Sequence, residues 1–284
     1  TLTRVQNLGA HLMPPGEEEL AAQLGVAGAA AWSSLRDDLG GRATVTLEDT
    51  LGLLDSFGVS LVRSQRSEAA VATLAAPMGY DTWSVSYAAS RYRQFLPNEQ
   101  EQTGGSHTAS LAWNRVLHLS AAGRDSADVS LTYGDAWRRV DEIPLSPERL
   151  TVLKAALTCL RQGEGWRAWG EGGLARGLAW FGAPGDRPGL PAAAPHVRFT
   201  KVEGHAGLIV APAGLPLGYT GQMDVQYSPV GLYGPEQFRL GGMTSVRGFD
   251  ETIAAGDRGT QFRHELSLRT SQSDADGGTA MPFV

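Results

Sequence analysis

Two stretches near the end of the chain decide the fold: "YTGQMDVQYS" at residues 219–228 and "QFRHELSLR" at residues 261–269. In the first, apolar and aromatic residues fall mainly at odd positions and polar residues at even positions. In the second, Phe262, His264, Leu266 and Leu268 alternate with charged or polar residues. Strict alternation over this length predicts β-strands with one apolar face and one polar face.

The same pattern recurs along most of the chain as segments of about ten residues, each followed by a turn. Only the first 25 or so residues show a weak helical character. The sequence predicts about twelve strands, near residues 28–37, 43–49, 57–64, 70–78, 83–94, 108–119, 127–138, 150–161, 167–181, 198–210, 219–228 and 260–269.

Short and long connections alternate between these segments. "GYDT", "AAGRD" and "GEGW" are short, whereas "LPNEQEQTGGS", "EIPLSPER" and "GDRPGLPAAAPH" are longer. Short turns at one end and long loops at the other are typical of an outer-membrane barrel, although a soluble β-sandwich also alternates its faces. Charged residues inside several strands would be unusual in a sandwich core and suit a wet barrel lumen. The expected lumen-facing residues are Lys201, Glu203, His205, Gln222, Asp224 and Arg263. The predicted fold class is all-β, a transmembrane antiparallel β-barrel.

Composition excludes several other classes of protein. The net charge of −6 gives no reason to expect nucleic acid, and no run of 18 apolar residues predicts a transmembrane helix. Cys159 is the only cysteine, so there is no disulfide framework or thiolate metal cluster. No signal peptide opens the sequence, and we expect a fragment whose targeting signal lies upstream.

Motifs for catalysis are scarce. "GEGGLA" at residues 170–175 fits a dinucleotide-binding pattern but lacks a surrounding βαβ unit, so we interpret it as a glycine-rich strand. The six histidines show no metal-ligand spacing. We therefore expect no catalytic residue, no metal, no cofactor and no small-molecule substrate, and hence no enzyme.

One loop, at residues 235–258, carries the sequence "LGGMTSVRGF". A flexible surface loop would explain its glycines but not its apolar Val246 and Phe249. If the loop instead folds back into a polar lumen, Arg247 can form a bidentate bond with a carboxylate on the wall. Gly248 would allow close approach of the backbone. The predicted loop latch consists of Gly242, Val246, Arg247, Gly248 and Phe249.

"RLGGMTSVRGFDE" followed by "GDRGTQFRHEL" resembles the signature of the two-partner secretion transporters, the haemolysin-activator family. This family shares a superfamily with the outer-membrane barrel-assembly protein. The resemblance extends to "DDLGGRATVTLEDTLGLLDSFGVSL", "APMGYDTWSVSYAASRYRQFL" and "ARGLAWFGAPGD", and covers roughly residues 28–284. Within the motif of the loop and the next strand lie Gly256, Arg258, Gly259 and Glu265.

The resemblance implies a bacterial outer-membrane barrel of sixteen strands, of which this chain holds about the first twelve at residues 28–284. Residues 1–27 would be the remnant of a preceding periplasmic polypeptide-transport-associated domain. In the family the loop arginine pairs with an aspartate on strand thirteen, which would lie beyond Val284. The implied function is export, without ATP, of a large partner protein that becomes β-helical after export, with outer-membrane lipid around the barrel. A barrel-assembly subunit, a passive porin and, more distantly, a soluble β-sheet binding module remain alternatives.

Overall fold

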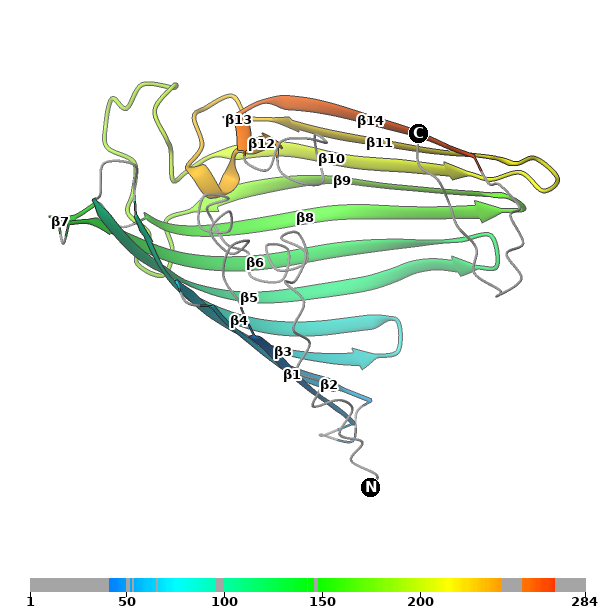
Figure 1. Cartoon of the computed structure of the whole chain (residues 1–284), viewed down its shortest axis with the longest axis horizontal. Coiled ribbons are helices and arrows are strands. Elements are labelled where there is room, and N and C mark those ends of the chain that lie inside the picture. The colour runs from blue at the N-terminus through cyan, green and yellow to red at the C-terminus, as the bar shows by residue number, and fades with distance from the viewer. Residues whose placement is uncertain are drawn as a thin grey trace.

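Nearly all strands join in one curved antiparallel sheet, in which strands that follow one another in the sequence lie side by side (Figure 1). The computed structural model describes residues 41–49, 52, 54–64, 66–95, 100–141, 143–145, 148–241 and 252–268. Along the sheet the order is β1-β2-β3-β4-β5-β6-β8-β9-β10-β11-β14, with β7 beside β6, while β12 and β13 form a separate pair. Within the described ranges no helix is long and apolar enough to cross a bilayer.

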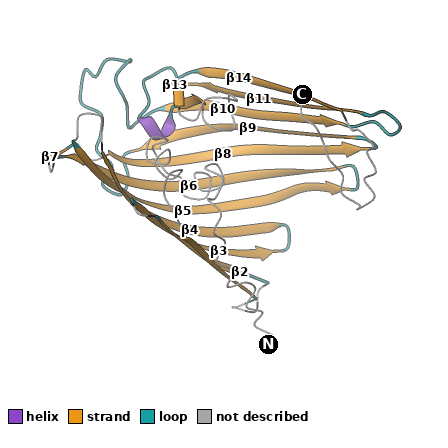
Figure 2. Ribbon diagram, in the orientation of Figure 1, coloured by secondary structure: helices purple, strands orange, loops and turns teal. Residues whose placement is uncertain are grey.

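The strands of the first half are β1 (Gly41–Glu48), β2 (Ser56–Arg63), β3 (Ser67–Met78), β4 (Asp81–Phe95), β5 (Glu101–Ser120), β6 (Gly123–Val140) and β7 (Ile143–Pro144). The second half holds β8 (Glu148–Gly163), β9 (Trp166–Leu178), β10 (Thr200–Val210), β11 (Leu217–Tyr227), β12 (Phe238–Gly241), β13 (Thr252–Gly256) and β14 (Gly259–Leu268). A short 3-10 helix, η3 (Gly234–Glu236), precedes β12 (Figure 2). Every predicted strand from 43–49 onward is confirmed, and the one at 28–37 lies outside the described residues, as does segment 1–27.

The two ends of the sheet differ, as the sequence predicts. At one end, called the turn end, two residues connect β3 to β4, β5 to β6, and β8 to β9. Gly79 and Gly165, with φ of 66° and 71°, adopt the left-handed conformation that these tight turns require. The other end, called the loop end, carries the connections at 179–199 and 228–258 (Figure 1).

Register separates the residues into two faces. His205, Asp224 and Gln261 are cross-strand partners on one side, which we call the polar face, whereas Ala206, Met223 and Phe262 are partners on the other, the apolar face. Large side chains of the apolar face are uncovered: the exposed fraction is 63% for Leu157 and 61% for Leu266. Such a large exposed apolar surface suits lipid rather than water.

One predicted boundary is wrong. The sequence predicts that "EQTGGS" lies in a loop before a strand at 108–119, but this segment forms the start of β5, which has 20 residues. The alternation is hidden here because Gly104 and Gly105 have no side chains. Glycine is needed at both positions because large neighbours fill the space: a Cβ on Gly104 would lie 2.6 Å from the Tyr92 ring, and one on Gly105 would lie 3.0 Å from Nε1 of Trp137. About 9–11 tilted residues cross a bilayer, so β5 extends well beyond the hydrocarbon core.

The described sheet is open. β1 and β14 lie at its two edges and do not pair with each other. An unpaired edge cannot face hydrocarbon, because its backbone polar groups would lack partners. The described sheet is therefore part of a barrel wall.

Candidate functional site: the excursion between β11 and β14

The chain leaves the sheet after β11 and returns at β14, its direct neighbour. We call the segment 228–258 the excursion; it includes η3 and the β12–β13 pair. The predicted latch residues Gly242, Val246, Arg247, Gly248 and Phe249 lie outside the described residues. What the structure describes is how the two limbs of the excursion are held.

The base of the excursion is tied by Asp257 and Arg258. The Leu232 amide donates to Oδ1 of Asp257 at 2.7 Å, and the Ser228 amide donates to the Asp257 carbonyl at 3.1 Å. Nε of Arg258 donates to the Ser228 carbonyl at 2.9 Å, and its guanidinium lies 4.7 Å from the centre of the Tyr227 ring. These contacts join the outgoing limb to the returning limb, because Leu232 and Ser228 belong to one and Asp257 and Arg258 to the other.

The β12–β13 pair lies over the polar face. The Phe238 ring covers Gly259, so that a Cβ at 259 would lie 2.1 Å from a ring carbon. No side chain fits there without displacing the ring, which explains this glycine of the sequence motif. Gly256 is the register partner of Phe238, and a Cβ there would make only an ordinary contact, 3.6 Å from the Arg258 carbonyl oxygen. The described geometry does not require glycine at 256.

A chain of charges beneath η3 connects the excursion to the wall. Nζ of Lys201 lies 2.9 Å from Oε2 of Glu236 in η3 and 3.3 Å from Oε2 of Glu203. Oε1 of Glu203 lies 2.5 Å from Nζ of Lys154, which also lies 2.8 Å from Oε1 of Glu171. We call Lys154, Glu171, Lys201, Glu203 and Glu236 the lysine–glutamate network. It runs from β8 through β9 and β10 to η3.

The network is best sheltered where it meets the excursion. The Lys201 side chain is 9% exposed and that of Glu203 is 13% exposed, compared with 32% for Lys154. The Glu236 carbonyl also accepts hydrogen bonds from Nζ of Lys201 at 3.3 Å and from Nε2 of Gln226 at 2.9 Å. Removing one partner of a sheltered ion pair leaves an uncompensated charge and is costly. η3 is therefore fixed to the polar face through specific electrostatic contacts.

The second long loop at the loop end, residues 179–199, packs against the excursion. The His196 amide donates to the Gly231 carbonyl at 2.9 Å, and the Gly231 amide donates to the Ala192 carbonyl at 2.7 Å. A Cβ on Gly231 would lie 2.6 Å from the Ala194 carbonyl oxygen, so the close backbone approach requires glycine. Leu150, Ala183 and Val197 form a small buried cluster beside them. The excursion is held from below by charges and from the side by backbone contacts.

Comparison with known proteins identifies the family to which this architecture belongs. Residues 35–284 match the family model described as haemolysin secretion/activation protein ShlB/FhaC/HecB. The chain belongs to this family. It is therefore part of a bacterial outer-membrane β-barrel, in agreement with the resemblance of its VRGF segment.

Curated relatives in the family are outer membrane transporters named CdiB. The protein of Dickeya dadantii strain 3937 is 29% identical over 247 residues, which cover 81% of this chain and 43% of that protein. The CdiB-2 protein of Burkholderia pseudomallei strain 1026b is 28% identical over 250 residues, 83% of this chain and 43% of its own length. The chain thus spans less than half the length of these relatives.

Solved structures agree with the fold. CdiB from Escherichia coli superposes with a TM-score of 0.74 at 27% identity, covering 83% of this chain and 46% of that one. BamA from Haemophilus ducreyi lacking POTRA domains 1–3 gives a TM-score of 0.54 at 12% identity, covering 84% of this chain and 52% of that one. This second likeness shows the barrel fold alone.

The remaining predicted residues of this family member lie on the polar face. Nδ1 of His205 lies 2.6 Å from Oδ1 of Asp224, and Gln222 is the register partner of Arg263. Nη2 of Arg263 lies 3.8 Å from Oε2 of Glu265. All six residues expected to face the lumen therefore share one face with Glu265, and Lys201 and Glu203 are the two that contact the excursion or its network.

The described charges of the arrangement anchor the excursion electrostatically. Among the described residues no group of three or more His, Cys, Asp or Glu side chains is placed to hold a metal ion. The "GEGGLA" segment lies in β9, where Glu171 pairs with Lys154, as its interpretation as a strand requires.

Sequence reasoning missed Lys154, Glu236 and Asp257, and it placed Gln226 on the polar face without giving it a role. A signal existed for Lys154, since it is the only charged residue within the apolar stretch "TVLKAALTCL". Glu236 and Asp257 could not be found in this way, because they lie outside the alternating segments and act through contacts between distant parts of the chain.

Proposed function

We propose that the protein containing this chain is an outer-membrane translocation pore that exports a secreted partner protein in two-partner secretion. The partner would cross unfolded, become β-helical outside and require no ATP. Small-molecule turnover is not part of this function. Residues 1–27 would be the end of a preceding periplasmic domain that receives the partner.

The observation that carries the proposal is the docking of the excursion on the polar face. The lysine–glutamate network and the Phe238–Gly259 contact hold it inside the curve of the wall, where a translocating chain would pass. Membership of the ShlB/FhaC/HecB family and similarity to transporters named CdiB support the same function. In this proposal the excursion, with Arg247 at its centre, fixes the state of the pore that is competent for secretion.

The test is export in a reconstituted two-protein system. The complete reading frame that contains this chain is expressed in a heterologous Gram-negative host, together with a candidate partner, a large secreted protein of the β-helical type. The partner should reach the medium only when the barrel protein is present, and dissipating cellular ATP after periplasmic accumulation should leave this step intact. Equal amounts of partner in the medium with and without the barrel protein would refute the proposal.

A further inference from the structure

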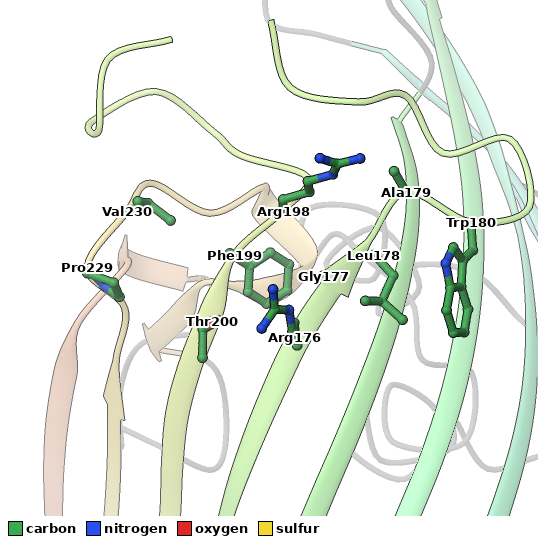
Figure 3. A pocket seen from close by; sticks show the side chains of 10 residues that line it. All are labelled: Arg176, Gly177, Leu178, Ala179, Trp180, Arg198, Phe199, Thr200, Pro229 and Val230. Atoms are coloured by element: carbon green, nitrogen blue, oxygen red, sulfur yellow. The ribbon is translucent and has the colours of Figure 1, made fainter. Parts of the chain in front are cut away.

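A cavity of about 480 Å³ lies at the loop end of the sheet, between the end of β9, the start of β10 and the residues after β11 (Figure 3). Two arginines, Arg176 and Arg198, are among its lining residues. Nothing in the proposed function uses them.

The cavity borders the apolar face. Arg176 is the register partner of Thr200, and the next pair on the same face is Leu174 with Val202. Leu174 is 57% exposed and Val202 is 49% exposed. On the opposite side of the sheet the Phe199 ring, which is 3% exposed as a residue, lies over Gly177 and closes the wall. The guanidinium of Arg176 therefore projects on the surface that contacts lipid.

Neither guanidinium has an acidic partner within the described part of the chain. Asp186, the acidic residue of the 179–199 loop, uses its carboxylate to accept hydrogen bonds from the amides of Val197 at 2.7 Å and Arg198 at 3.1 Å. Two other exposed arginines toward the loop end are paired: Arg149 lies 3.1 Å from Asp135, and Arg93 lies 2.8 Å from Glu101. Two unpaired guanidinium groups at one cavity repel each other, and an anion bound between them offsets this repulsion because it attracts both.

The chemistry of the cavity fits a phosphate that carries an apolar tail. Guanidinium groups bind phosphate through paired charge-assisted hydrogen bonds, and the Thr200 hydroxyl can add another. Below the arginines, Leu174 and Val202 offer an apolar surface for acyl chains. Trp180, which lines the same cavity and is 53% exposed, is the type of side chain that prefers the boundary between hydrocarbon and headgroups.

We propose that Arg176 and Arg198 form a binding site for the phosphorylated headgroup of a lipid in the outer leaflet, with the acyl chains on Leu174 and Val202. The inference rests on the outer-membrane location and on the rule that long loops of such barrels face outward. It does not depend on which protein is exported.

Native mass spectrometry of the complete protein in detergent, titrated with bisphosphorylated lipid A, tests the site. Each of Arg176→Gln and Arg198→Gln should weaken binding about tenfold, because each removes a charge-assisted contact. The matched control is Arg149→Gln, an arginine toward the same end whose charge is already paired; it should change the apparent Kd less than about twofold. Faster migration of unheated samples in electrophoresis verifies that each barrel is folded.

Three outcomes overturn the site. These are unchanged lipid A binding by the Arg176→Gln/Arg198→Gln double variant, equal binding of dephosphorylated lipid A, and binding of inorganic phosphate alone as tightly as lipid A. Partner export is measured on the same variants. Loss of lipid A binding with normal export supports the site, whereas failure of the wild-type protein to export refutes the proposed function and leaves the lipid result intact.

Discussion

The polar face has two halves of different chemistry. We call its part on β2–β5 the hydroxyl wall and its part on β8–β11 and β14 the charged wall. From Ser56 to Asn114, every residue of these strands on the polar face is uncharged, and hydroxyl pairs such as Ser90–Ser106 at 2.9 Å and Ser110–Thr132 at 3.2 Å line it. The charged wall carries the lysine–glutamate network, His205–Asp224 and Arg263–Glu265.

Apart from its contacts with the 179–199 loop, the contacts described above for the excursion are with the charged wall. A segment that must stay docked needs strong, specific contacts, which sheltered charges supply. A surface along which an unfolded chain slides needs many weak and similar contacts, and small hydroxyl side chains supply these. If the protein exports a partner as proposed, the comparison predicts that one wall holds the excursion and the other guides the partner.

The largest effect is expected from removing Lys201, the charge that joins the excursion to the charged wall. Lys201→Met should lower the free energy of opening the excursion by about 3–5 kcal/mol, since Glu236 and Glu203 lose a sheltered partner. Hydrogen exchange at the Leu232 amide, which is bonded to Asp257, reports this opening. The control Arg167→Met removes an exposed charge of the same face at the turn end and should leave that amide unchanged. Equal protection in both variants would contradict the role of the network.

The next test compares an arginine placed on the apolar face with an arginine placed on the polar face. Leu266→Arg places a charge on the apolar face and should cost roughly 2–4 kcal/mol of barrel stability in lipid vesicles. Gln222→Arg places the same side chain on the polar face and should cost much less. Unfolding by denaturant in vesicles measures both, and similar losses for the two variants would argue against lipid on the apolar face.

The predicted latch gives a smaller free-energy effect but a clear functional one. Arg247→Ala should reduce partner export at least about tenfold, which corresponds to about 1.4 kcal/mol, while the barrel level in the outer membrane changes little. Arg247→Lys should impair export nearly as much, because lysine lacks the planar fork that binds a carboxylate in two places. Undiminished export by Arg247→Ala would return the loop to a flexible surface segment.

The strands could be predicted from the alternation of apolar and polar residues, because lipid on one side of the sheet and water on the other impose a period of two. The same signal assigned Lys201, Glu203 and Asp224 to one face. It failed at Gly104, where a missing side chain hides the period. It also gave no sign of η3 or of the β12–β13 pair, which are short and follow no period.

Contacts between non-adjacent strands could not be predicted from the sequence for a different reason. Lys154 and Glu203 lie in β8 and β10, separated in space by β9, and their meeting depends on the register of two pairings. Register across the 179–199 loop cannot be deduced from its length. Arg176 lies before that loop and Arg198 lies near its end, and so their shared cavity appears only in three dimensions.

The smallest effect is expected in the hydroxyl wall, and its smallness is what the comparison requires. Ser110→Ala removes a neutral hydrogen bond to Thr132, which leaves a hydroxyl that water in the lumen can satisfy. The expected loss of stability is at most about 1 kcal/mol, and export should remain within about twofold of the wild type. Ser110→Glu is the more informative variant. It adds a charge to the hydroxyl wall, which has none, and leaves the residues that hold the excursion unchanged. If weak, uniform contacts matter for passage, Ser110→Glu should slow the appearance of the partner in the medium while Leu232 amide exchange stays normal. Unaltered export kinetics in Ser110→Glu would show that the hydroxyl wall has no part in guiding the partner.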